Sequence, residues 1–392
     1  MNQPLPGTRI QSIDILRGLV IVIMVLDHAR DYFHDSGSQY DPLDPNFTTA
    51  LLYCTRWITN FCAPTFVFLA GVSIWLQAVK GKNTPQLSRF LLSRGLWIVI
   101  LELTVISFGW SFSIPFLPFL QVMWAIGWSM VALSALVWLP RQLVLGIGIA
   151  IIACHNLLDP VKSQQLGDFA VLWKFLHEEG LILSGGQPAA YAAYPLLAWI
   201  GVMALGYGLG AVFLSPKRDR ILIQLGLALV ATFFILRCIN GYGDPLPWTV
   251  QADWGKTAML FFHVQKYPPS LMFVCATLGP VLLLIPVLER SKGPVVEFFR
   301  TFGAVPMMAY LSHLYVLHAL AVAAHFAAGH KVDGMFNTIY IYFLRPEALA
   351  GTGFPLWVTF LAWIVIVALI YPLCRWWGAV KRRRRDWWLS YL

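Results

Sequence analysis

SIDILRGLVIVIMVLDHARDY, residues 12–32, decides how the chain is organised. The apolar run from Leu19 to Leu26, together with its flanks, has the length of a helix that crosses a membrane. Insertion scales assign a cost of about 2.5–3.5 kcal/mol to a charged residue at the centre of such a helix. Ionisable residues near the run therefore indicate either a functional site or a pairing partner. They are Asp14 and Arg17 before the run and Asp27, His28, Arg30 and Asp31 after it.

Arg17 and His28 lie eleven positions apart in this stretch. At about 100° per residue they return to nearly the same helix face, with roughly 16 Å of helical rise between them. One face then carries a cation at one end and an imidazole at the other. A purely structural alternative is that Asp14 pairs with Arg17 at the headgroup level while His28 lies unused in the outer interface. The spacing leaves both interpretations open.

The composition is that of an integral membrane protein, because 58% of the 392 residues are hydrophobic and only 12% are charged. The length allows about ten spans of ~20 residues with short connections. We therefore expect an all-α polytopic membrane protein, with one helical bundle over residues 1–392 and a basic cytoplasmic tail at 378–392. The predicted spans are 13–33, 57–79, 90–110, 119–139, 143–158, 191–214, 221–239, 269–288, 302–326 and 355–377.

Lysine and arginine gather in every second predicted loop and in the tail, whereas the loops between them are rich in aspartate and glutamate. This distribution follows the positive-inside rule and predicts that both termini are cytoplasmic and that His28 lies near the outer surface. A bacterial inner membrane is the expected location. The net charge of +9 then reflects membrane topology and attraction to anionic lipids, and we expect no nucleic-acid partner.

Two motifs carry a resemblance to a known family. The first is S-x-D-x-x-R-G followed by the apolar run and Asp27-His28, and the second is TRWITNFCAPTFVFLAG at 55–71. Weaker similarities lie in KYPPSLMF at 266–273 and AYLSHLYVLH at 309–318. Together they resemble the catalytic-domain family of heparan-alpha-glucosaminide N-acetyltransferase. The spacing from Arg17 to His28 is also similar to the first-helix motif of the acyltransferase-3 membrane enzymes.

The resemblance implies a transmembrane acyltransferase. Such an enzyme moves an acetyl or other acyl group from cytoplasmic acyl-CoA, with acetyl-CoA the expected donor, to a sugar, glycan or glycolipid acceptor on the outer side. Arg17, with Asp14 beside it, would bind the CoA phosphates, and the pantetheine arm would extend along the apolar stretch. His28 would be the base, since an imidazole exchanges protons near neutral pH. Asp27 or Asp31 would orient its ring. Direct transfer and an acyl-histidine intermediate both remain open.

Further polar residues are predicted at the outer ends of the spans. Arg30, Arg56 and Lys266 are candidates, by charge and side, to stabilise an oxyanion or to bind the acceptor together with Tyr267. His313 and His318 share one predicted span but point about 140° apart. They cannot both face one pocket closely. The resemblance favours His313, whereas depth measured from Phe302 favours His318.

Other functional classes remain to be weighed. The six cysteines show no ligand spacing, so we expect neither a disulfide framework nor a metal site. The alternative to an enzyme is a proton-coupled transporter or a lipid-binding or solute-binding membrane protein, in which Asp27, His28 and Glu102 form a polar path. The acceptor, the acyl chain and the oligomeric state, including a homo-oligomer, are not determined by the sequence.

Overall fold

The computed structural model describes residues 10–35, 40–384, 386 and 389. The predicted basic tail therefore lies partly outside the described residues, at 385, 387–388 and 390–392. The α-helices are α1 (Gln11–Phe33), α2 (Ala50–Ile58), α3 (Cys62–Val79), α4 (Thr84–Leu101), α5 (Ser107–Ser111), α6 (Val122–Leu136), α7 (Arg141–Cys154), α8 (Ala170–Leu176), α9 (Leu196–Leu209), α10 (Arg218–Ile239), α11 (Trp254–Phe262), α12 (Leu271–Arg290), α13 (Pro294–Gly303), α14 (Pro306–Ala327), α15 (Thr338–Leu344) and α16 (Leu356–Arg383).

Short helical segments and three strands complete the described chain. The segments are η2 (Thr59–Phe61), η3 (Glu102–Ile106, a π-helical turn), η4 (His155–Leu158), η5 (Ser163–Gln165), η6 (Gly167–Phe169), η7 (Gly210–Leu214), η8 (Asp333–Met335) and η9 (Pro346–Leu349). The strands are β1 (Phe119–Leu120), β2 (Gly180–Ser184) and β3 (Gln187–Ala192). β2 and β3 form an antiparallel hairpin, and β1 pairs with β3 in parallel.

Within the described residues, eight helical segments are long and apolar enough to cross a membrane. They confirm the prediction of a helical membrane protein and cover 50–79, 84–111, 141–158, 196–214, 218–239, 271–290, 306–327 and 356–383. The other two predicted spans are also helical. α1 differs from the eight by the charged residues at its ends, and α6 is shorter, with 15 residues. Ten crossings therefore stay a prediction.

Several predicted span boundaries are wrong. Phe119 and Tyr191 were expected at the starts of spans, but they pair with each other as partners in β1 and β3. Phe302 belongs to α13, and α14 begins four residues later at Pro306, whose fixed φ suits the first turn of a helix. The depth estimate for the histidines of α14 therefore started from the wrong residue.

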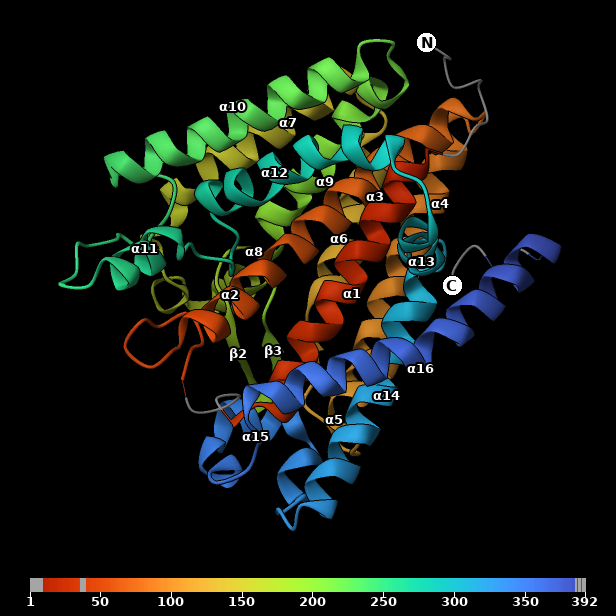
Figure 1. Cartoon of the computed structure of the whole chain (residues 1–392). Helices are drawn as coiled ribbons and strands as arrows, with labels where there is room; N and C mark the ends of the chain where they lie inside the picture. Colours follow the sequence, from red (N-terminus) through yellow and green to blue (C-terminus); the bar gives the residue numbers. More distant parts are fainter. Residues whose placement is uncertain (1–9, 36–39, 385, 387–388, 390–392) are drawn as a thin grey trace.

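α1 lies in the middle of the molecule (Figure 1). It packs against α3, α12, α13, α14 and α16, and most of its side chains are buried. Its ionisable residues Asp14, His28 and Arg30 are among the buried ones. They consequently face protein groups, which can satisfy them, and not lipid.

The start of α1 meets α13 at two glycines. A Cβ atom added to Gly18 would overlap the backbone carbonyl of Phe299, and one added to Gly303 would overlap the carbonyl of Asp14. Backbone atoms cannot move aside as a flexible side chain can. This close approach brings α13, which is too short to span a membrane, against the first turns of α1.

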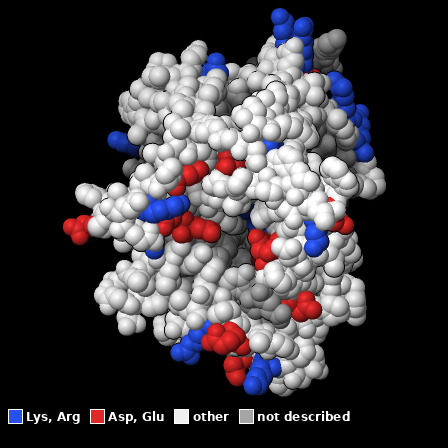
Figure 2. Space-filling view, turned by 90° about the vertical axis from the view of Figure 1, so that its left-hand side faces the viewer, with Lys and Arg blue, Asp and Glu red and all other residues white. Residues whose placement is uncertain are grey.

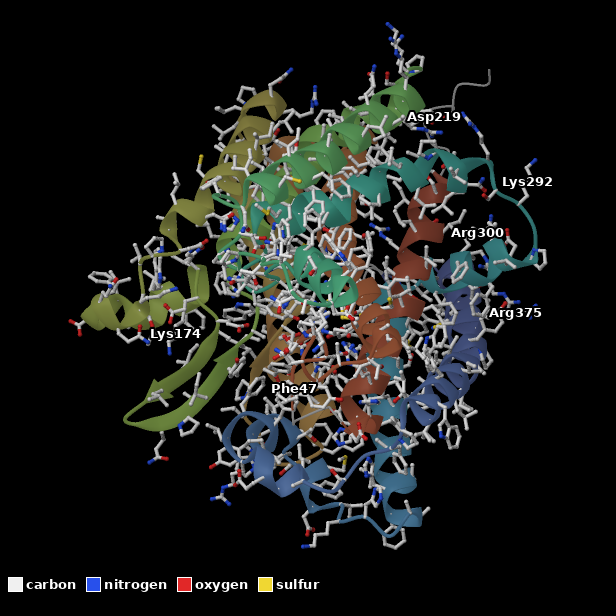
Figure 3. All side chains as sticks on the ribbon, turned by 60° about the vertical axis from the view of Figure 1, so that its left-hand side comes forward. Phe47, Lys174, Asp219, Lys292, Arg300 and Arg375 are labelled. Atoms are coloured by element: carbon white, nitrogen blue, oxygen red, sulfur yellow. The ribbon has the colours of Figure 1, made fainter. Side chains whose placement is uncertain are left out.

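Labelled side chains mark two opposite ends of the molecule (Figure 3). Lys292, Arg300 and Arg375 lie toward one end, and Phe47 and Lys174 lie toward the opposite one (Figure 3). That opposite end also holds α2, α8, α11, α15 and the hairpin (Figure 1). The predicted sidedness and the cytoplasmic location of the termini stay predictions. We refer to the end with α2, α11 and the hairpin as the outer end.

We expect Gly18→Ala to destabilise the protein strongly, because the added methyl group has no space beside the Phe299 carbonyl. Overpacking of this kind costs on the order of 1–3 kcal/mol or more. Thermal unfolding in detergent measures the effect. Gly146→Ala is the matched control, since a Cβ there meets nothing within 4 Å and alanine is the better helix former. Equal melting temperatures for the two variants would contradict this account of the packing.

Candidate active site

A cavity of about 600 Å³ opens at the outer end. This volume falls in the roughly 300–1,000 Å³ range of small-molecule sites. Aromatic rings and charged side chains share its wall. The charged residues are Asp27, Arg30, Asp31, Asp41, Arg56, Glu179 and Lys266, and the aromatic residues include Trp110, Tyr191, Tyr267 and Tyr342. Figure 2 shows acidic side chains gathered around a hollow on this side of the molecule.

His28 and His313 form a pair behind one side of this cavity: neither lines it, but Asp27 and Trp110, which adjoin His28, do. Nδ1 of His28 lies 2.8 Å from Nε2 of His313, and the two rings stack with centroids 5.0 Å apart. Trp110, which lines the cavity, packs edge-on against the His28 ring at 4.8 Å. His313 is fully buried, and His28 is 8% exposed. The pair therefore joins the last turns of α1 to the middle of α14.

The hydrogen bonds of the pair assign its protons. Nδ1 of His313 lies 3.1 Å from the carbonyl oxygen of Ala309, which can only accept, so this nitrogen carries a hydrogen. In a neutral His313, Nε2 must then accept, and Nδ1 of His28 must donate to it. Nε2 of His28 is left with a free lone pair, and no group among the described residues bonds to it. This nitrogen has the form that a general base requires.

Asp27 and Asp31 do not orient the His28 ring, contrary to the expectation from sequence. Both carboxylates bind Nη2 of Arg30 at 2.7 Å, and Asp27 also accepts from the Thr59 hydroxyl at 2.8 Å. The reason is geometric, because Asp27 and Arg30 are three residues apart on one helix face, which favours ion pairing. His313 occupies the position that was assigned to a carboxylate.

Arg30 has an unused hydrogen-bonding group in this network. Its side chain is 5% exposed and lines the cavity, yet Nη1 has no partner among the described residues. Arg56 donates from Nη1 to Thr59 and Asn60 at 3.1 Å each, and Lys266 is 8% exposed. The predicted residues Arg30, Arg56, Lys266 and Tyr267 are thus brought together in one wall.

His318 lies outside this arrangement. Its two nitrogens face the backbone carbonyls of Gly109 and Met335 at 2.8 and 2.7 Å, and its ring stacks on Phe112 at 3.9 Å. These contacts give it a structural role between α5 and the segment after α14. Of the two histidines left open by the sequence, the structure brings His313 to His28.

Arg17 and Asp14 lie near the other end of α1. Arg17 donates from Nη2 to the carbonyl of Leu69 at 3.1 Å and to the hydroxyl of Ser73 at 2.7 Å, both on α3. His28 instead contacts α14. The two residues that share a face by ideal helical spacing are therefore in contact with different neighbouring helices, and Arg17 does not line the outer cavity.

His263, which follows α11, also lines the cavity. Burial lowers the pKa of His263, and the carboxylates of Asp41 and Asp244 offset only part of that shift. The imidazole is consequently neutral at neutral pH and available to accept or donate a hydrogen bond in the cavity.

The comparison with known families follows this geometry. The family model described as heparan-alpha-glucosaminide N-acetyltransferase, catalytic, matches residues 9–237. The chain belongs to this family. The match includes Asp27, His28 and Arg56, and it ends before Lys266 and His313. No curated protein matches the chain. As a member of this family, the protein is a membrane acetyltransferase.

Sequence reasoning missed part of this candidate site. Tyr32 lines the cavity, stacks on Trp110 and donates to the Trp110 carbonyl at 2.6 Å. Its position four residues after His28 places it on the same helix face, which was a usable signal. Glu179 and Tyr191 come from the hairpin region, where the sequence predicted either a loop or a span, and no local pattern points them into a cavity.

We expect Arg30→Ala to destabilise this acetyltransferase by about 3–5 kcal/mol, the usual cost of removing one partner from a buried ion pair. The two carboxylates would be left to repel each other. Arg290→Ala is the control, because Arg290 binds Asp219 at 2.6 Å with its side chain 74% exposed, and exposed pairs contribute about 0–1 kcal/mol. Thermal unfolding in detergent compares them, and a larger loss for the Arg290 variant would refute the prediction.

Proposed function

We propose that the protein transfers the acetyl group of cytoplasmic acetyl-CoA to an amine or hydroxyl of a sugar or glycolipid acceptor that binds in the outer cavity. The observation that carries this proposal is the His28–His313 pair, which leaves one imidazole nitrogen of His28 free beside a cavity of suitable size. A bacterial inner membrane is the proposed location, with the cavity on the periplasmic side.

His28 would act as the general base. Its Nε2 removes the proton from the acceptor N–H or O–H while that atom attacks the thioester carbonyl carbon. The C–S bond then breaks, and the proton held by His28 passes to the departing sulfur, giving the acetylated acceptor and free CoA. His313 supports this exchange, since it accepts from Nδ1 of His28 and so keeps the other nitrogen unprotonated. An acyl-histidine intermediate would use the same nitrogen as nucleophile.

The cavity wall would bind the acceptor and the developing oxyanion. Nη1 of Arg30 is buried without a partner, so a substrate oxygen would satisfy it. Lys266 and Tyr267 offer a cation and a hydroxyl in the same wall, and the aromatic rings can pack against the apolar faces of a sugar. Asp27 and Asp31 would hold Arg30 in place.

Arg17 would bind the donor at the opposite end of α1. The rise of roughly 16 Å between Arg17 and His28 is of the order of the extended pantetheine arm of CoA. The nucleotide could then stay on the cytoplasmic side while the thioester reaches His28. The hydrogen bonds of Arg17 to α3 fix its guanidinium, and Asp14 lies in the same first turns.

Replacing His28 by Ala should lower kcat by about 100- to 10,000-fold, the contribution of a positioned general base. His313→Leu should lower kcat as well. In this variant Nδ1 of His28 loses its hydrogen-bond acceptor, so the proton is no longer held on Nδ1. Acetyl transfer from labelled acetyl-CoA in detergent is the measurement. The control is His330→Ala, which alters a histidine that contacts His325 and neither member of the pair.

Two outcomes of that assay would count against the proposal. Full turnover in the His28 variant would place the base elsewhere. Failure of the wild-type protein to bind acetyl-CoA would favour the transporter interpretation, in which Asp27, His28 and Glu102 share a polar path. Glu102 accepts a hydrogen bond from the backbone N–H of Gln121 at 2.8 Å and bonds to neither of the other two.

Arg17→Ala should raise KM for acetyl-CoA by about 10-fold or more, since a charge-assisted phosphate contact is worth on the order of 1.5–3 kcal/mol. KM for the acceptor should change little, because Arg17 does not line the outer cavity. Arg17→Lys keeps the charge and should recover part of the loss. An equal rise in both KM values would indicate general damage and would remove Arg17 from the donor site.

A further inference from the structure

Three metal-ligating side chains meet at the outer end, away from the His28–His313 pair. His155 and Asp159 lie at the end of α7 and η4, and His177 follows α8. Each offers one ligand atom, and these atoms all lie within 4.8 Å of one another. His177 and Asp159 already touch, with Nε2 and Oδ1 3.1 Å apart. No metal site was expected from the sequence, because the six cysteines show no ligand spacing; these three ligands come from two separate segments of the chain.

The two histidines lack the partners that buried imidazoles normally have. His155 is 2% exposed, and neither of its ring nitrogens makes a hydrogen bond within the described part of the chain. Nδ1 of the 3% exposed His177 is also without a partner. The Pro269 carbonyl lies near the His155 ring but does not form a hydrogen bond with it. Since buried polar groups are nearly always satisfied, these nitrogens point to a ligand.

Asp159 is held in place by a second layer of contacts. Asn156 donates to Oδ2 of Asp159 at 2.8 Å and accepts from the backbone N–H of Leu271 at 3.0 Å. The second oxygen, Oδ1, faces the histidines. Trp173 packs against the His177 ring with centroids 5.3 Å apart. Hydrogen-bonded carboxylates and packed imidazoles of this kind are typical of the surroundings of metal ligands.

One side of the cluster is open. A second cavity, of about 220 Å³, is lined by Asp159 and His177 together with Glu178 and Glu179. It gives an ion a route of entry and leaves room for a water molecule as a fourth ligand. Both oxygens of Glu178 are occupied, because they accept from the N–H and hydroxyl of Ser163 at 2.7 and 2.8 Å.

We propose that His155, Asp159 and His177 bind a zinc ion. Two imidazoles and one carboxylate suit Zn²⁺, whereas Ca²⁺ and Mg²⁺ prefer sites built of oxygen. Zinc–ligand bonds of about 2.0–2.1 Å set neighbouring ligand atoms about 3.3 Å apart in a tetrahedral site. The present spacing requires a modest side-chain rotation when the ion enters. The ion replaces the His177–Asp159 hydrogen bond and satisfies one of the two unpartnered nitrogens of His155.

The zinc ion would stabilise the wall of the larger cavity. It links the end of α7 to the segment after α8, and that segment continues directly into β2 and β3. Glu179 and Tyr191, which line the larger cavity, belong to this stretch. The ion is therefore structural with respect to the larger cavity, and its binding does not depend on the proposed transfer reaction.

Metal content tests the proposal directly. The full-length protein in detergent is treated with a chelator, supplied with one equivalent of ZnCl₂, desalted and analysed by mass spectrometry for metals. We expect about one zinc per chain, filling three protein ligands and one water position. His155→Ala and His177→Ala should each weaken zinc binding by more than about 100-fold, since even the loss of an outer contact costs 10- to 100-fold.

The control is His330→Ala. His330 Nδ1 lies 3.1 Å from Nδ1 of His325, so this pair could also attract a metal. Retention of zinc by the His330 variant supports the proposal, whereas its loss there would place the ion at His325–His330 and overturn it. Equal zinc content in the wild type and in both ligand variants would overturn it as well.

Cobalt substitution gives a second measurement that needs no variant. Co²⁺ bound by two imidazoles and a carboxylate in four-coordinate geometry absorbs visible light far more strongly than the hydrated ion. We expect such a band in the wild-type protein and its disappearance on addition of zinc. If the wild-type protein gave only the spectrum of hydrated cobalt, the proposed site would be refuted. This outcome does not depend on whether the ligand variants fold. Asp159→Asn, which keeps the side-chain shape, should weaken the band.

Discussion

The packing of α1 in the middle of the molecule, among α3, α12, α13, α14 and α16, is the constraint on which the rest of the structure depends. A helix with ionisable groups at both ends is costly in lipid, but here neighbouring helices supply the partners. The contact at Gly18 and Gly303 brings α13 against the first turns, and α3 and α14 receive Arg17 and His28. Since α1 is enclosed, its polar residues can be kept in defined geometry, which lipid contact would not allow.

The geometry at His28 follows from ordinary helix chemistry on α14. A histidine in a helix can direct Nδ1 to the carbonyl four residues earlier, and His313 does so with Ala309. That single contact fixes which nitrogen of His313 accepts, and hence which nitrogen of His28 is free. The carboxylates beside His28 take no part, because Arg30 binds both of them. Two neutral imidazoles in contact add no further buried charge beside a wall that already holds Asp27, Arg30 and Lys266.

The class of fold and the polar residues at the end of α1 could be predicted from the sequence. Apolar length predicted the helices, and the motif from Asp14 to Asp31 placed Asp27, His28 and Arg30 correctly at the end of α1. It could not choose between His313 and His318, because the choice depends on the start of α14 at Pro306 and on the position of its neighbours. The prediction that Asp27 or Asp31 orients the His28 ring was wrong, because Arg30 binds both carboxylates. Spacing along one helix does not show this competition. The side chains of Glu179, Tyr191 and His177 come from a hairpin and loops whose position is set by tertiary contacts alone.

The outer wall of the cavity depends on a buried cation that lies outside the cavity itself. Arg237 is 1% exposed and donates to four backbone carbonyls, those of Leu246, Leu260, Phe261 and His263. These bonds hold the end of α11 and the segment that leads to Lys266. Asp244 completes the arrangement by accepting from the Gln265 N–H at 2.9 Å and the Ser270 hydroxyl. Lys266 and Tyr267 can therefore be presented to the cavity from a loop, because the loop's own polar groups are satisfied before any substrate binds.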